Sequence, residues 1–249
     1  MNKINAIYVS LLSLVVALGT LIYCVVFCCN KEEPATAEVD VESVKAILLE
    51  NPEMIIESLQ KGEAKRQEEM RLAAQKLIGE HIDEINNYPQ SPVLGNKDGK
   101  VTIVEFFDFA CGYCHRLSPT LMNIIKKNSD VRLVLKPVYF LSPASSYAAK
   151  ALYAADEQGL AKEFYVGVME HKGQLSEDVI NEIATKVGMN IEKMKATMAS
   201  DEVSKAMGDT SELAQKIQVT GVPTLVIEGE RVQTLSETEI QNKIDAAKK

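Results

Sequence analysis

Two cysteines separated by two residues carry the clearest chemical signal in the chain. They lie in the run Cys111-Gly112-Tyr113-Cys114, which follows a hydrophobic stretch and precedes a segment with helical periodicity. A cysteine at the amino end of a helix faces unpaired backbone N–H groups and the positive end of the helix dipole, and both stabilise its thiolate. We therefore predict that Cys111 is a nucleophile at neutral pH. Cys114, one turn further on, would resolve a mixed disulfide by attacking Cys111.

Two other chemistries use cysteines at this spacing. A zinc site needs a second CxxC or a pair of histidines, and neither pattern occurs, so we expect no metal. His115 completes the sequence of a haem c attachment motif, but a hydrophobic strand rather than a haem pocket precedes it. We expect no cofactor beyond a redox-active disulfide between Cys111 and Cys114. His115 itself either faces solvent on the helix or is a cation that supports the Cys111 thiolate.

A proline at the entrance of a late strand is the second chemical element. It lies in Thr220-Gly221-Val222-Pro223-Thr224. Proline cannot donate a hydrogen bond within a sheet, and the bond preceding it is the one peptide bond for which the cis form is accessible. Alone, this pattern describes an ordinary loop proline. Combined with the CxxC, it favours a thiol-disulfide site.

The surrounding pattern is that of an α/β domain. Buried strands are predicted over 101–107, 131–140 and 224–229, with 231–235 pairing to the last of them as a hairpin. Helices are predicted over 41–48, 52–86 and 112–127, and a series of helices follows to residue 217. A capping box at Ser236 and Glu239 opens a final helix.

The segments VEFFDFACGYC (104–114) and TGVPTLVI (220–227) resemble the thioredoxin superfamily and, within it, the DsbA family of bacterial periplasmic thiol-disulfide oxidoreductases. The resemblance covers roughly 89–249 and implies a thioredoxin fold with a helical insertion over about 141–217. It also implies that a cis bond between Val222 and Pro223 lies against the cysteines and receives substrate as an added strand. Glu105 would be a buried acid that moves protons during exchange, unless it points outward from an edge strand.

The amino terminus predicts export. Residues 4–29 contain no charged side chain, and a helix of this length can cross a bilayer. We therefore expect residues 1–30 to be a signal or membrane anchor. Lys3 precedes this segment, and the positive-inside rule places the rest of the chain outside the cytoplasm. Cleavage after Ala37 and lipidation at Cys29 are the alternatives to a retained anchor.

The region 31–88 is predicted to be helical and acidic. It contains seven basic and fourteen acidic residues, within a chain of net charge -8 that has the wrong sign for binding nucleic acid. An apolar stripe runs along these helices. The stripe would pack either against another copy of the chain, making a homo-oligomer through 38–88, or back onto its own domain.

These features together predict a protein-disulfide oxidoreductase, with domains at 1–30, 31–88 and 89–249. It would form or exchange disulfides in unfolded or misoxidised exported proteins, in the periplasm, beside a membrane redox partner. The alternative is an oligomeric isomerase or reductase that a membrane reductase keeps reduced: Gly112 and Tyr113 resemble the isomerases, whereas Val222 before Pro223 resembles the oxidants. Outside this class, the rival is a tethered chaperone module with incidental cysteines.

Overall fold

The computed structural model describes residues 15–23 and 40–248. The predicted cleavage site at Ala37, the lipidation site at Cys29 and most of the predicted anchor over 1–30 lie outside the described residues. Residues 15–23 are helical. Within the described ranges, we find no helix that is long and apolar enough to cross a membrane. The chain divides into two compact units, residues 1–63 and 64–249.

Two helices of the first unit have exposed apolar side chains. The helix α2 (Val41–Glu50) begins at Asp40, whose carboxylate accepts hydrogen bonds from the backbone N–H groups of the first turn. A single residue, Asn51, separates α2 from the helix α3 (Pro52–Glu80), which continues into the second unit. No side chain of α2 is buried. The large apolar side chains exposed in this unit include Val41, Val44, Ile47, Leu48, Leu49, Met54, Ile55, Ile56 and Leu59.

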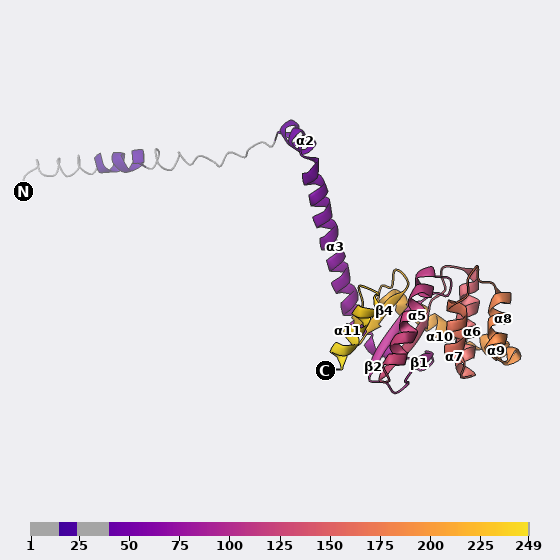
Figure 1. Ribbon diagram of the computed structural model, residues 1–249. Coiled ribbons are helices and arrows are strands. Elements are labelled where there is room, and N and C mark those ends of the chain that lie inside the picture. The colour runs from indigo at the N-terminus through magenta and orange to yellow at the C-terminus, as the bar shows by residue number, and fades with distance from the viewer. Residues whose placement is uncertain (1–14, 24–39, 249) are drawn as a thin grey trace, which may run out of the picture. The chain divides into compact units, whose positions relative to one another are not determined.

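The second unit is built on a five-stranded sheet, visible in Figure 1. The strand order is β1 (Val93–Gly95), β3 (Val131–Pro137), β2 (Val101–Phe107), β4 (Thr224–Ile227) and β5 (Glu230–Arg231). The β2 and β3 strands are parallel, and all other neighbours are antiparallel. The central strand predicted over 101–107 is therefore confirmed, with the same bounds, as β2.

Three details of the sheet differ from the sequence prediction. The β1 strand was not predicted, because three residues between turn-forming segments carry too little pattern. The β3 strand ends at Pro137, since proline has no N–H to continue the pairing. The hairpin after β4 contains only Arg231 of the predicted partner segment 231–235.

Both faces of the sheet are covered by helices. On one face, Ile103 and Phe107 belong to a core that includes α5 (Gly112–Lys127), α11 (Glu237–Ala247) and the inserted helices. On the other face, Val104 and Phe106 pack in a core with side chains from three helices, namely Ile78 of α3, Ile85 of α4 (Ile82–Asn87), and Leu213 and Ala214 of α10 (Asp201–Lys216). Ile78 and Ile85, which belong to the predicted region 31–88, thus pack on the sheet of the second unit.

The predicted helical insertion lies between β3 and β4. It consists of α6 (Pro143–Glu157), α7 (Ala161–Met169), α8 (Glu177–Lys186), α9 (Ile191–Met198) and α10. Four of these helices begin at a polar residue whose side chain accepts a backbone hydrogen bond, namely Ser142, Ser176, Asn190 and Ser200. The thioredoxin-like α/β fold with additional helices is therefore confirmed.

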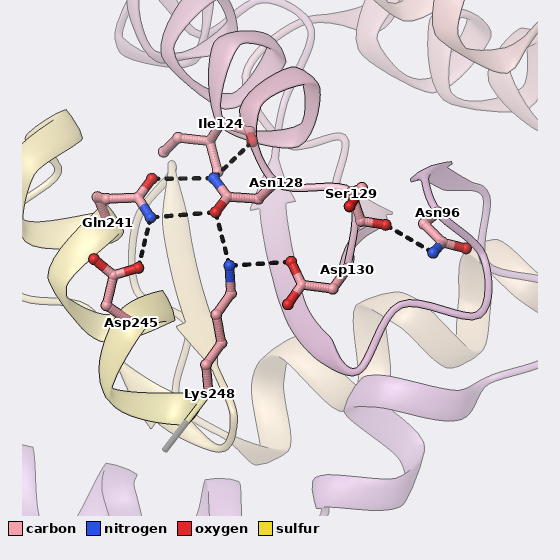
Figure 2. Close-up of polar contacts among 8 residues, drawn as sticks. All are labelled: Asn96, Ile124, Asn128, Ser129, Asp130, Gln241, Asp245 and Lys248. Carbon is pink, nitrogen blue, oxygen red and sulfur yellow. Dashed lines mark hydrogen bonds and ion pairs between the residues drawn. The ribbon is translucent and has the colours of Figure 1, made fainter.

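A polar network fixes the carboxy-terminal helix to the far end of α5 (Figure 2). The Asn128 side-chain amide donates to Ile124 O and to Gln241 Oε1, both at 3.0 Å. Lys248 Nζ donates to Asn128 Oδ1 at 2.8 Å and pairs with Asp130 at 3.0 Å. These contacts join α11, the end of α5 and the start of β3, so the helix that begins at the cysteines is held at its other end.

Candidate active site

Cys111 is the residue at which α5 begins. Its backbone is extended, its N–H donates to Asp108 O at 2.9 Å, and its carbonyl accepts the first helical hydrogen bond, from His115 N at 3.1 Å. The Cys111 side chain is 6% exposed and that of Cys114, inside the first turn, is 0% exposed. Both thiols are free. Cys111 therefore keeps a small exposed surface at the helix start, whereas Cys114 is the more buried of the two, as predicted.

The Val222-Pro223 segment lies directly against Cys111. The peptide bond between the two residues is cis. The Cys111 Sγ–H donates to the carbonyl oxygen of Val222 at 3.4 Å. Since β4 begins one residue after Pro223 and pairs with β2, the sheet holds this loop in place beside the cysteines. The two segments that carried the resemblance are thus brought together.

Glu105 is fully buried beneath the site, in the centre of β2. Its neighbours on the flanking strands are Leu135 and Leu225, so the alternative of an outward-facing residue on an edge strand is wrong. The Tyr165 hydroxyl on α7 donates to Glu105 Oε2 at 2.8 Å. Burial raises the pKa of Glu105 to about 8, and the Tyr165 hydrogen bond opposes this shift.

Cys114 needs a proton acceptor if it is to act as a nucleophile. Burial raises the pKa of its thiol well above the ordinary value, although a hydrogen bond to the Asp108 backbone opposes the rise. The charge of Glu105 adds to the rise, which places the carboxyl within electrostatic range of the thiol. A thiol of this kind reacts only when a nearby base takes its proton as it attacks.

The other residues of the motif are less buried than the cysteines. Gly112 is exposed, and Tyr113 is 70% exposed with the Arg116 guanidinium 4.1 Å from the centre of its ring. His115 is half-buried and its Nε2 donates to Phe109 O at 2.6 Å. This contact was not predicted. It ties the histidine to the loop before Cys111 rather than leaving the ring in solvent.

Asp108 is a functional candidate that the sequence analysis missed. It is fully buried between β2 and Cys111, and its carboxylate accepts hydrogen bonds from Ala110 N, Phe140 N, Leu141 N and Ser145 Oγ. The carboxylate therefore ties the loop before the cysteines to the loop after β3. An acidic residue between a buried strand and the CxxC marks this position in the sequence, but its hydrogen-bond partners follow only from the fold.

Cys114 is fully buried in the core shared by α5 and the sheet, and Cys111 lies against the Val222 carbonyl. A β-sheet with a CxxC at a helix start, facing a cis-proline loop, defines a thioredoxin-like protein.

Comparison with known proteins gives the family. A family model for the DSBA-like thioredoxin domain matches residues 102–244. The chain belongs to this family. A crystal structure of a thioredoxin-like oxidoreductase from Silicibacter pomeroyi is 34% identical, covers 67% of this chain and 96% of its own, and superposes with a TM-score of 0.63.

Curated relatives match part of the chain. The thiol:disulfide interchange protein DsbA of Pseudomonas syringae pv. tomato is 30% identical over 138 residues, which are 53% of this chain and 64% of the relative. The Na(+)/H(+) antiporter NhaA 1 of Salinispora arenicola is 26% identical over 141 residues, which are 56% of this chain and 22% of the relative. This chain thus spans less than a quarter of the antiporter and about two thirds of the interchange protein.

Proposed function

We propose that this protein is a thiol-disulfide oxidoreductase in which Cys111 is the nucleophile and Cys114 the resolving cysteine. The observation that carries the proposal is the position of Cys111, at the start of α5 and 3.4 Å from the Val222 carbonyl, with Cys114 buried one turn below. The DSBA-like family match and the related thiol:disulfide interchange proteins support the same activity.

Disulfide formation in a substrate starts from the Cys111–Cys114 disulfide. A substrate thiolate attacks Cys111 Sγ, the bond between the two cysteines breaks, and Cys114 leaves as a thiolate that takes up a proton. A second substrate thiolate then attacks the substrate sulfur of the mixed disulfide and releases Cys111 as a thiolate. The substrate loses two electrons, and the protein gains them. In the reverse direction, Glu105 is the base that accepts the Cys114 proton.

The substrates we propose are unfolded or misoxidised exported proteins. Val222 and Pro223 would hold an extended substrate segment as an added strand, which needs an unfolded chain. Large side chains with apolar surface are exposed in the cysteine motif and in the loop after β3: Tyr113, Phe140 and Leu141 are 70%, 58% and 50% exposed. The last two follow β3 in the loop that Asp108 ties to the cysteine loop. Such a surface favours clients with exposed apolar segments.

Location and self-association belong to the same proposal. The predicted export signal, together with the thiol chemistry, favours the periplasm, with the amino-terminal segment as an inner-membrane tether and cleaved or lipidated forms as the alternatives. The exposed apolar side chains of α2 and of α3 up to residue 63 would pack against the same helices of a second copy. An oligomer would favour the isomerase or reductase alternative, because several sites could then act on one misoxidised client.

The direction of exchange depends on the redox partner. The redox state of Cys111 and Cys114 in living cells reports that direction. Cells that express the full chain with Cys24, Cys28 and Cys29 changed to Ser are quenched in acid, and free thiols are labelled with a maleimide that adds mass. A mostly oxidised Cys111–Cys114 pair would support an oxidase, and a mostly reduced pair would support an isomerase or reductase. Labelling that does not respond to either oxidant or reductant would overturn the proposal.

The variant Cys111→Ser distinguishes the proposed enzyme from the alternative of a tethered chaperone module. A thiol-disulfide oxidoreductase loses its exchange activity on this substitution, because the nucleophile is gone. If Cys111→Ser protects unfolded clients and promotes their disulfides as well as the unchanged protein does, the tethered chaperone module is the correct description.

A further inference from the structure

The inserted helix α7 contributes one polar group to the buried site, and that group is the Tyr165 hydroxyl. Tyr165 is fully buried and donates to Glu105 Oε2 at 2.8 Å. The Ser118 hydroxyl, on the helix that carries the cysteines, adjoins the same Tyr165 oxygen. Since a phenol donates one hydrogen and accepts others, a donor from Ser118 favours the orientation in which Tyr165 donates to the carboxyl.

The other carboxyl oxygen of Glu105 is left without a partner. Glu105 Oε1 is buried and makes no hydrogen bond with any residue that the structure describes. A buried carboxyl oxygen without a partner is costly, and such groups occur where chemistry needs a free acceptor. With Oε2 held by Tyr165, Oε1 is the atom that remains free to receive a proton.

We propose that Tyr165 is a positioning residue that holds Glu105 as the proton acceptor for Cys114 during resolution of the mixed disulfide. This inference rests on the proposed function, because it assigns a role within the exchange reaction. The helical insertion then takes part in the reaction, since its Tyr165 supplies the hydrogen bond that favours the carboxylate form of the buried acid. The role assigned to Tyr165 is exerted through Glu105.

The groups that face Glu105 are few. Among the described residues, they are the Cys114 thiol from α5 and the Tyr165 hydroxyl from α7, whereas Leu135 and Leu225 flank it on the neighbouring strands. Loss of the Tyr165 hydroxyl therefore removes the one hydrogen bond that favours ionised Glu105. The fraction of carboxylate at neutral pH would fall, and Cys114 would resolve the mixed disulfide more slowly.

The test follows single turnovers of the reduced full chain, carrying the three amino-terminal Cys→Ser changes, with glutathione disulfide. Cys111 thiolate attacks the glutathione disulfide and releases one glutathione, and Cys114 then attacks Cys111 Sγ, releases the second glutathione and loses its proton to Glu105. Rapid acid quenching and mass measurement separate the two steps. We expect Tyr165→Phe to leave the first step unchanged and to slow the second about tenfold at pH 7.

The pH profile separates positioning from packing. The Tyr165→Phe defect should disappear at high pH, where Glu105 is ionised without help, and the midpoint of the profile should move up by about one pH unit. In a Glu105→Gln background, Tyr165→Phe should cause no further loss. The control is Tyr153→Phe, which removes another buried hydroxyl of the insertion, 3.4 Å from Thr210 Oγ1. It should leave both steps unchanged.

A wild-type rate for Tyr165→Phe, or slowing by one factor at every pH, would overturn the inference. A different result would contradict the proposed function itself, namely that the unchanged protein forms no mixed disulfide at Cys111. If Tyr165→Phe does not fold, 3-fluorotyrosine at position 165 keeps the ring and makes a stronger donor. Resolution at pH 7 should then be faster than in the unchanged protein, and an unchanged or slower rate would contradict the role.

Discussion

The Cys111 sulfur lies 3.4 Å from the Val222 carbonyl oxygen, although 111 positions separate the two residues in the chain. The pairing of β2 with β4 makes this contact, because one strand leads into the cysteines and the other leaves the proline loop. In the function we propose, Cys111 would exchange disulfides beside this backbone segment. The helical insertion lies between these two strands in sequence and need not disturb their pairing.

Asp108 should be essential for the shape of this site. Asp108→Ala would leave three backbone N–H groups and the Ser145 hydroxyl without their acceptor, and we expect a loss of roughly 3 kcal/mol or more in the free energy of unfolding. Denaturant unfolding of the variant measures this loss. Asp98→Ala, at an exposed acidic residue, is the control and should change stability little. Equal stability of the two variants would contradict the role of Asp108.

Glu105 should make stability fall as pH rises. Its pKa is about 8 in the folded protein against an ordinary value of 4.5, so between these values the folded state binds the proton and the unfolded state does not. The free energy of unfolding is therefore highest below about pH 4.5 and declines as the pH rises towards 8. The decline attributable to this group is at most roughly 5 kcal/mol. Denaturant unfolding across this range measures it.

Glu105→Gln supplies the control for that profile. Glutamine keeps the size of the side chain and cannot ionise, so the difference in stability between the two proteins should grow steadily from pH 4.5 to pH 8 in favour of the variant. A difference that stays constant over this range would mean that Glu105 has an ordinary pKa in the folded protein.

Self-association should depend on the apolar side chains of the first unit. Ile47 and Ile55 are 52% and 41% exposed within one copy of the chain. Replacing both by Glu places charges where a second copy would pack, and light scattering after size exclusion should then report a monomer in place of an oligomer. The control is Lys61→Glu with Lys65→Glu, which changes the charge of exposed positions on α3 without touching apolar side chains. A monomer before any substitution would refute the proposed oligomer.

The predictions from sequence succeeded where one short segment contained the whole signal. The buried strand at 101–107, the CxxC at a helix start and the Ser236 cap each follow from neighbouring residues. The roles of Asp108 and Tyr165 could not be predicted in this way. Their partners are brought together only by the fold: Phe140 lies 32 positions after Asp108, and Tyr165 lies 60 positions after Glu105.

The packing of α3 shows the same limit. Its apolar stripe was compatible with a second copy and with its own domain, because periodicity identifies an apolar face and not the surface that covers it. Ile78 packs beneath the sheet with Val104, whereas Ile55 and Leu59 of the same helix are exposed. One helix therefore carries two kinds of apolar surface, and only the structure distinguishes them.

The most direct test of the account is to trap the mixed disulfide. In a chain with Cys24, Cys28, Cys29 and Cys114 changed to Ser, Cys111 alone can react with a disulfide-bonded peptide, and no resolving thiol can release the product. Mass spectrometry should find one peptide half attached at Cys111, removable by reductant, and no adduct when Cys111 is also changed to Ser. Absence of the adduct, or its persistence without Cys111, would contradict the assignment of Cys111 as the nucleophile.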